Sequence, residues 1–478
     1  MPHHARSAVP ASLLLAVALV TGGAHAQSAS APDETAFREL YRQLVEIDTT
    51  LSSGSCTAAA EAMAERLRAA GLPAKEVRIL APAEHPRSGA LIATLPGRDR
   101  ALKPVLLLAH IDVVEAKRDD WERDPFKLVE EGGFFYARGA SDDKAMAAAL
   151  TDALIRYRTE GFVPLRDIKL ALTCGEETPE TFNGVKWLLE THPEVLKSSF
   201  VLNEGGSGSL DAAGKPIVLE VQAGEKVYQD FTLETTNRGG HSAQPVRSNA
   251  INELAAGLSR LAALQFPISV NPTTRAYFEQ QTVHATPDLA ADIRAVIGRD
   301  PPDAAAAERL WAADPRWNAM LRTTCVTTLI EGGHAPNALP QRARANVNCR
   351  ILPGVAVEDV RAELVRVLAD DGISVQPANE PGLAAPVPPL TPRILEPVRE
   401  VAAGIWPGVP VVPTMTVGGT DGRYLNAAGI PTYGMTGMFF DAEGSHAHGL
   451  NERIRVKSLM DGRRFLYEVV KIYAMQQD

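Results

Sequence analysis

Two hydrophobic periodicities alternate along the first half of the chain. Apolar residues recur at helical spacing over residues 34–47 and 57–70, and short apolar runs follow at 91–95 and 105–109. Helical and strand patterns continue to take turns, at residues 144–159, 168–172, 183–190 and 200–203. This alternation predicts an α/β structure with a largely parallel central sheet.

A second type of pattern occupies the middle of the chain. Alternating strand patterns occur at residues 228–236, 323–333 and 342–352, and a helical pattern lies at residues 249–264. They indicate an α+β unit, interrupted by helices and loops over residues 270–318. Because the α/β pattern then resumes, we predict a first unit made of residues 27–226 and 353–478, with residues 227–352 inserted into it.

Residues 1–26 have the features of a secretory signal peptide. Arg6 precedes an apolar core at residues 8–20, and Ala24-His25-Ala26 has the small-x-small pattern of a cleavage site. The core is shorter than the roughly 20 residues of a membrane span. We expect cleavage after Ala26 and a secreted or periplasmic protein without a stable membrane span; the alternative is an uncleaved anchor.

Composition narrows the range of partners. The 478 residues are 45% hydrophobic and 22% charged, which is ordinary for a globular protein of two or three domains. The formal net charge is −10 and no basic block is present, which argues against nucleic acid and anionic membranes. A small-molecule or peptide substrate is the expected partner.

The four cysteines do not form a disulfide scaffold in a chain of this length. Cys325 and Cys349 lie on two predicted strands, so a cross-strand disulfide between them is a candidate. Cys56 and Cys174 look unpaired.

Acidic residues and histidines gather where predicted strands end. They are His110 and Asp112, Asp142 and Asp143, Glu176 and Glu177, Glu204, and the pair His446 and His448. Open α/β sheets bind ligands at the carboxyl ends of their strands, so we expect these groups to converge on one crevice. As alternatives, Glu176 and Glu177 could form a solvated turn, and Asp142 or Asp143 could cap the following helix.

Histidines and carboxylates without a thiolate suit zinc or a similar divalent ion. A carboxylate that bridges two ions also relieves the repulsion between neighbouring negative charges. One glutamate of the adjacent pair can therefore be a ligand, while the other takes a proton from water.

Five ordered motifs resemble metallopeptidase family 20, which includes carboxypeptidase G2, aminoacylase-1 and carboxypeptidase S. They are His110-x-Asp112, RGASDDKA, Gly175-Glu176-Glu177, NEGG and His448-Gly-Leu-Asn451-Glu452. The last motif is most similar to the carboxypeptidase S and fatty-acyl-amino-acid hydrolase branch. The resemblance implies a zinc-peptidase catalytic domain with an inserted α+β lid or dimerisation domain.

The resemblance also implies a ligand set for two zinc ions, with cobalt or manganese as substitutes. Asp142 would bridge the ions. His110 and Glu204 would complete the shell of one ion, and Glu177 and His448 that of the other. His446 is the alternative to His448.

Further roles follow from the same resemblance. Glu176 would be the general base and acid, and Asp112 would orient His110 through its other ring nitrogen. The family often has a cis peptide after the bridging aspartate, here between Asp142 and Asp143.

Four residues are expected at the substrate. His241 resembles a histidine that polarises the scissile carbonyl, usually from the partner subunit, and Asn337 and Arg350 resemble groups that hold the substrate's oxygen and carboxylate. Arg423, in GGTDGRY, is a candidate for the substrate pocket. His241 and Arg350 could instead serve local hydrogen bonds or ion pairs.

The expected function is a secreted di-zinc hydrolase that releases an amino acid with a free carboxylate, as a carboxypeptidase or dipeptidase does. An N-acyl-amino-acid deacylase is the alternative with the same machinery. A non-catalytic binding protein is the alternative from another class. A homodimer is a candidate assembly, although an enlarged insert could cover the site within one subunit.

Overall fold

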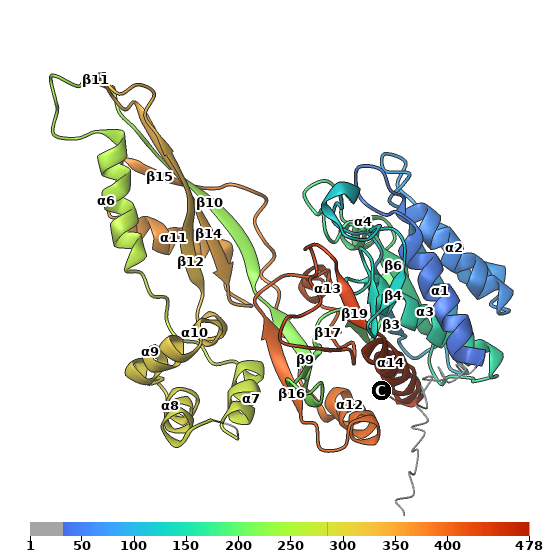
Figure 1. Cartoon of the computed structure of the whole chain (residues 1–478). Helices are drawn as coiled ribbons and strands as arrows, with labels where there is room; N and C mark the ends of the chain where they lie inside the picture. The colour runs from blue at the N-terminus through green and yellow to red at the C-terminus, as the bar shows by residue number, and fades with distance from the viewer. Residues whose placement is uncertain (1–31, 284, 478) are drawn as a thin grey trace, which may run out of the picture.

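The computed structural model describes residues 32–283 and 285–477, which form two bodies (Figure 1). We name them the central unit (residues 32–225 and 392–477) and the inserted unit (residues 227–377). The predicted signal peptide lies outside the described residues. Within these ranges, no helix combines the length and apolar character needed to cross a membrane.

The central unit is built on a ten-stranded sheet in the order β1-β2-β6-β3-β7-β17-β9-β8-β18, with β16 paired to β9. Its strands are β1 (Val77–Leu80), β2 (Ala90–Leu95), β3 (Val105–His110), β6 (Ile168–Thr173), β7 (Phe200–Asn203), β8 (Gly208–Leu210), β9 (Pro216–Glu225), β16 (Val411–Thr416), β17 (Thr432–Gly434) and β18 (Phe439–Phe440). β3 runs parallel to both β6 and β7, with His110 opposite Thr173. The carboxyl ends of these three strands therefore share one edge, and the predicted α/β class with a largely parallel sheet is confirmed.

Helices cover both faces of this sheet (Figure 1). They are α1 (Pro32–Glu46), α2 (Cys56–Ala69), α3 (Lys144–Thr159), α4 (Gly184–Thr191), α5 (Pro193–Leu196), α12 (Pro392–Ile405), α13 (Gly422–Ala427) and α14 (Val456–Met475). Alternate residues of β3 contribute to two different apolar cores. Leu107 and Ala109 pack with α1, α2, α3 and α14, whereas Leu106 and Leu108 pack with α4 and α5. This two-sided burial explains why the strand is uniformly apolar.

A small three-stranded sheet stands beside the central one. It contains β4 (Val129–Glu131), β5 (Phe134–Tyr136) and β19 (Arg453–Arg455), and β19 pairs with β5. This pairing brings the segment just before β19 next to the loop that precedes α3.

The inserted unit contains an antiparallel sheet in the order β12-β14-β10-β15. Its elements are β10 (Val227–Thr236), β12 (Thr324–Gly332), β14 (Arg342–Ile351), β15 (Ile373–Pro377), α6 (Ala250–Ala262) and α11 (Val357–Leu368). Every second residue of β14, from Ala343 to Ile351, is buried in a core shared with α6 and α11. The helices therefore cover one face of the sheet and leave the other open.

Four helices occupy the segment predicted as helices and loops. They are α7 (Pro272–Gln281), α8 (Pro287–Ile297), α9 (Ala304–Ala313) and α10 (Pro315–Leu321). Asn271, Thr286, Asp303 and Asp314 cap their N-termini. Their apolar core includes Met415 of β16, so this layer also packs against the central unit.

The predicted end of the inserted unit at residue 352 is corrected by strand pairing. β15 lies beyond that residue and pairs antiparallel with β10, from Phe231 opposite Pro377 to Thr235 opposite Ile373. The helix and strand at residues 357–377 have the same periodicity as an α/β element. That periodicity does not show which sheet the strand joins.

All four cysteines form disulfides. Cys325 and Cys349 are opposite each other on β12 and β14, which confirms the candidate cross-strand bond. The expectation that Cys56 and Cys174 are unpaired is wrong, because they are bonded to each other. They are 118 residues apart and lie on a helix end and a strand end, so no local pattern indicates the pairing.

Candidate active site

The predicted ligands and base meet at the shared edge of β3, β6 and β7. His110 is the last residue of β3, Glu176 and Glu177 follow β6, and Glu204 follows β7 directly. Asp142 is in the loop before α3, and His448 is in the loop between β18 and β19. The chain therefore brings these residues from five separate segments to one place.

Asp142 lies between the two histidines. Its Oδ1 is 3.1 Å from Nε2 of His110, and its Oδ2 is 3.3 Å from Nε2 of His448. Glu204 Oε2 is 3.6 Å from His110 Nε2, and Glu177 Oε2 is 2.9 Å from His448 Nε2. The shortest contacts thus pair His110 with Glu204 and His448 with Glu177, and one oxygen of Asp142 lies toward each histidine. His446 makes no such contact among the described residues.

The site concentrates negative charge in a partly buried place. Burial, followed by the charge of Glu204, raises the pKa of Glu176 well above its ordinary value. Burial also raises the pKa of Glu204. The pKa of His448 is raised to about 10 by hydrogen bonds first with Asp142 and then with Glu177. Burial acts to raise the pKa of Asp142, but hydrogen bonds with His110 and His448 outweigh it and lower that pKa.

This donor set fits divalent metal ions. Two groups of three ligand atoms lie within 4.8 Å of one another, His110 with Asp142 and Glu177, and His110 with Glu176 and Glu204. Imidazole nitrogens and carboxylate oxygens are ordinary zinc ligands. Positive charge at this point would compensate the repulsion that raises the carboxyl pKa values.

Asp112 connects the His110 strand to the Glu176–Glu177 loop. Its carboxylate accepts the backbone N–H of Glu176 at 3.4 Å and that of Glu177 at 3.0 Å. Nδ1 of His110 is 3.1 Å from the backbone oxygen of Asp112 and 3.6 Å from its Oδ1. The backbone oxygen therefore makes the shorter contact with His110, while the carboxylate holds the loop.

Glu452 is a functional candidate that the sequence reasoning did not assign. This fully buried carboxylate accepts the backbone N–H of Ser141 at 2.8 Å, of Asp142 at 3.0 Å and of Gly139 at 2.9 Å, and it pairs with Arg138 at 2.8 Å. It thereby shapes the loop that presents Asp142, which is followed by a cis peptide, as the resemblance implies. The signal was its place in the motif that begins at His448.

Asp421 and Arg423 lie at the start of α13. Asp421 is buried and accepts hydrogen bonds from Asn183 Nδ2 at 2.6 Å and Thr173 Oγ1 at 3.3 Å. The guanidinium of Arg423 lies within electrostatic reach of Glu176. Among the predicted substrate-binding residues, Arg423 thus has an electrostatic interaction with the candidate base.

Arg350 lies at the junction between the units. Its guanidinium stacks on the ring of Tyr228, 4.6 Å from the centroid, and its Nη1 is 3.3 Å from the backbone oxygen of Val417. These contacts place it against the loop that leads to Arg423.

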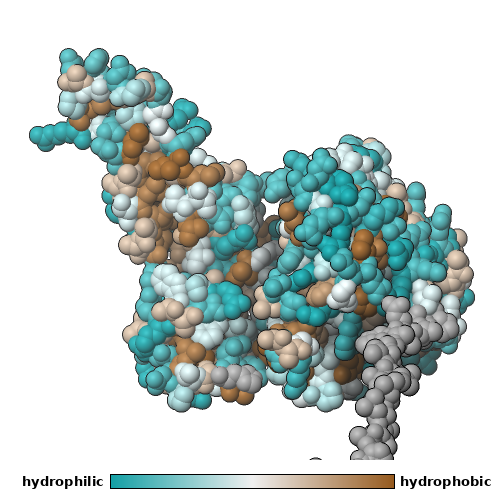
Figure 2. All heavy atoms as spheres, in the orientation of Figure 1, coloured by the Kyte–Doolittle hydropathy of each residue, from teal (hydrophilic) through white to brown (hydrophobic). Residues whose placement is uncertain are grey.

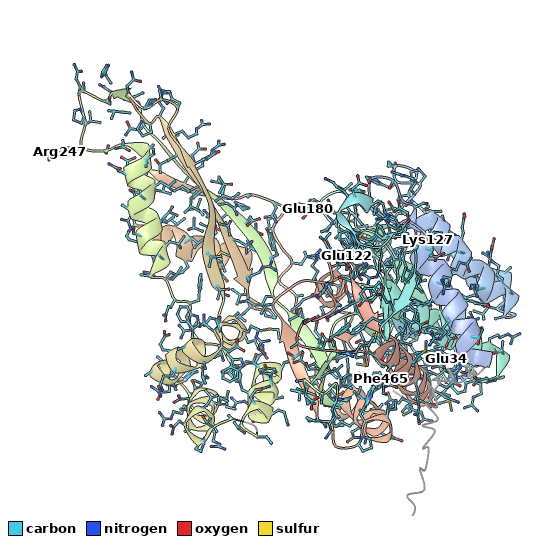
Figure 3. All side chains as sticks on the ribbon, viewed as in Figure 1. Glu34, Glu122, Lys127, Glu180, Arg247 and Phe465 are labelled. Atoms are coloured by element: carbon cyan, nitrogen blue, oxygen red, sulfur yellow. A yellow bond between two sulfur atoms is a disulfide. The ribbon has the colours of Figure 1, made fainter. Side chains whose placement is uncertain are left out.

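His241 and Asn337 are not brought to the ligand cluster within one chain. His241 belongs to β11 (Gly240–His241), which pairs with β13 (Ala338–Leu339), and Asn337 directly precedes β13; both residues are exposed. β11 lies at the tip of the inserted unit, near Arg247 (Figures 1 and 3). The backbone N–H of Ser242 donates to the oxygen of Asn337 at 3.0 Å, so the two residues are neighbours at this tip.

The profile of peptidase family M20/M25/M40 matches residues 106–472, which include the ligand cluster and the whole inserted unit. The chain belongs to this family. The predicted resemblance is confirmed, and so is the expectation of an enzyme that acts on amide bonds.

Individual proteins are similar to this chain in sequence or in fold. The human N-fatty-acyl-amino acid synthase/hydrolase PM20D1 is 29% identical over 388 residues, 79% of this chain and 76% of the relative. The M20 metallo-carboxypeptidase Sso-CP2 from Sulfolobus solfataricus superposes with a TM-score of 0.66 at 19% identity, over 93% of this chain and all of that one. The Bacillus subtilis YXEP protein, described as a dinuclear metal binding peptidase, has a TM-score of 0.59 at 14% identity, over 92% and 98% of the two chains.

Proposed function

We propose that this protein is an exported di-zinc hydrolase that cleaves an amide bond and releases an amino acid with a free carboxylate. The observation that carries the proposal is the position of Asp142, with one carboxylate oxygen toward each histidine and Glu176 nearby. Of the two sets, His110 and Glu204 would hold one ion, and Glu177 and His448 the other.

The chain's own residues would move the proton. When bound, the metal ions would polarise the carbonyl and lower the pKa of a water molecule. Glu176, which is not needed as a ligand in either set, takes the proton of the attacking water and returns it to the leaving nitrogen. A carboxyl whose pKa is raised by burial can accept and release a proton near neutral pH.

A free carboxylate on the released amino acid is supported by Arg423. A guanidinium presents several donors in one plane and suits a carboxylate with two oxygens. Arg423 lies within electrostatic reach of Glu176, and a carboxylate bound by it would suit a carboxypeptidase or a dipeptidase.

Export is supported by the disulfides as well as by residues 1–26. Disulfides persist in oxidising compartments and are rare in the cytosol, and both pairs of cysteines are bonded here.

A homodimer would explain the exposed tip. We infer that His241 and Asn337 act at the site of a partner subunit, since their own chain leaves them at the far end of the inserted unit. The edge strand β12 offers a surface for association, because Val326, Leu329 and Ile330 are 58%, 70% and 63% exposed. Apolar atoms are visible over the long strands of this unit (Figure 2). Sedimentation that gives a monomer at assay concentration would refute this assembly.

N-acyl-amino-acid hydrolysis is the second candidate, and it is favoured by the name of the human relative. The two candidates share the amino-acid carboxylate and differ in the group on the other side of the scissile bond. Substrate assays separate them.

The test is amino-acid release by the zinc-loaded protein from dipeptides, longer peptides, N-acetyl and N-fatty-acyl amino acids, and the C-terminal amide of each. Release from free acids but not amides supports the carboxylate requirement. Release from acylated amino acids alone establishes the deacylase. Glu176→Gln should keep both zinc ions and lower kcat by about 100-fold or more, and retained turnover would exclude Glu176 as the base.

A further inference from the structure

The loop that carries Glu176 and Glu177 is tied covalently to a distant part of the chain. Cys174, directly after β6, is bonded to Cys56, the first residue of α2. Both cysteines are buried, and α2 carries none of the ligands. The covalent tie therefore joins the start of the loop to a helix that carries none of the candidate ligands.

Non-covalent contacts restrain the loop mainly through its backbone. The N–H of Gly184 donates to the oxygen of Cys174 at 2.8 Å, and Asn183 Nδ2 donates to that of Gly175 at 3.2 Å. Gly175 has φ +90°, and a Cβ there would lie 2.2 Å from the oxygen of Phe182. The backbone thus leaves β6 through a turn that only glycine fits.

Side-chain packing restrains the loop less completely. A cavity of about 160 Å³ lies against it, lined by both cysteines and by Asp112, Thr178 and Phe182 among others. A space of this size would let the loop shift without a steric clash. The outer part of the loop, which carries Glu180, faces the inserted unit (Figure 3).

Asp112 joins the disulfide to the carboxylates. An oxygen of its carboxylate and both sulfur atoms lie within 4.8 Å of one another, and the same carboxylate accepts the amides of Glu176 and Glu177. Movement at Cys174 would therefore reach the two glutamates within three residues.

We propose that the Cys56–Cys174 disulfide is a positioning element of the active site, which holds the Glu176–Glu177 loop in register with Asp142 and His448. The roles of the two glutamates rest on the proposed function. Loss of the bond should lower kcat strongly, because a misplacement of catalytic groups by about 1 Å can lower a rate by about 100-fold.

The experiment opens the bond chemically, and thiol titration shows when the reduction is complete. A water-soluble phosphine supplies two electrons to the disulfide, two protons from solvent complete two thiols, and the phosphine takes up the oxygen of a water molecule as its oxide. The Cys325–Cys349 bond, in the inserted unit, serves as the matched control.

The experiment compares the full-length mature protein with Cys56→Ser/Cys174→Ser and Cys325→Ser/Cys349→Ser, all loaded with zinc. We expect the first double variant to lose kcat by about 10- to 100-fold with KM within about twofold, and to release one of its two zinc ions more readily to a competing chelator. The control should keep kcat and both ions. The control variant retains the Cys56–Cys174 bond, so phosphine should lower its kcat and reoxidation should restore that kcat. The kcat of the Cys56→Ser/Cys174→Ser variant should not change with phosphine.

Two results would overturn the proposal. One is a kcat within about twofold of wild type together with unchanged zinc retention. The other concerns the control variant: its kcat stays unchanged although thiol titration shows that the Cys56–Cys174 bond is fully reduced. This second result also decides the question if the Cys56→Ser/Cys174→Ser variant does not fold. If the oxidised wild type cleaves no substrate, the proposed function fails, whereas zinc retention in the same variants still tests the positioning role.

Discussion

The buried carboxylate of Glu452 should contribute strongly to the stability of the protein and to metal binding, through the loop that carries Asp142. Glu452→Gln keeps the length of the side chain and replaces one acceptor oxygen with an NH₂ donor. All the partners are donors: the backbone N–H groups of Ser141 and Asp142 on one oxygen, and Arg138 with the N–H of Gly139 on the other. Either orientation of the amide therefore sets donors against donors.

The magnitude follows from these partners. Each buried donor that loses its acceptor costs about 1–3 kcal/mol, and removal of one partner of a buried ion pair costs about 3–5 kcal/mol. These costs overlap, because one substitution cannot disrupt both oxygens. We expect the free energy of unfolding to fall by about 3–4 kcal/mol. Because the loop presents Asp142, zinc affinity and kcat should fall as well.

Urea denaturation of the metal-free protein measures the first effect, and chelator competition measures the second. Glu443→Gln is the matched control, since Glu443 is 73% exposed and its pairing with Arg453 is a surface ion pair worth about 0–1 kcal/mol. An unfolding free energy within about 0.5 kcal/mol of wild type, with normal zinc affinity, would refute the reasoning.

Three further predictions follow. Burial raises the pKa of Glu225 to about 8, so its contribution to stability is present below its unfolded pKa and is lost as pH rises through about 8. Between these two pKa values, the unfolding free energy of wild type relative to Glu225→Gln should fall by a few kcal/mol. A difference that does not change with pH would contradict this. Chelation should lower Tm, since ions that bind only the folded state stabilise it, and an unchanged Tm would contradict the proposed metal site. Arg423→Gln should raise KM for free-acid substrates by about tenfold or more, and equal loss on C-terminal amides would argue against a carboxylate contact.

The places of the candidate ligands could be predicted, because they depend on where individual strands end. Each ligand of the central sheet lies at a strand end, and parallel pairing sets the carboxyl ends of β3, β6 and β7 at one edge. The apolar runs fix those strand ends to within a residue or two, which is why His110 and Glu204 fall where expected.

Features that depend on long-range pairing could not be read in this way. The end of the inserted unit is set by the pairing of β15 with β10, and the Cys56–Cys174 bond by the meeting of a helix start with a strand end. Glu452 is fully buried, but one glutamate in a polar loop carries no periodic signal of burial. Such positions are specified by tertiary contacts, which periodicity does not encode.

The hydrogen-bond partners of the carboxylates at the site separate the residues that shape it from the candidate ligands. Asp112 and Glu452 each accept backbone N–H groups, so their charges are satisfied by the protein itself. Asp142, Glu177 and Glu204 accept no backbone N–H among the described residues, and their polar contacts are with histidines. Carboxylates that lose contact with water and receive no backbone donor are costly unless positive charge compensates them. The same fold therefore uses one set of acids to set the loops and leaves the other set for metal ions.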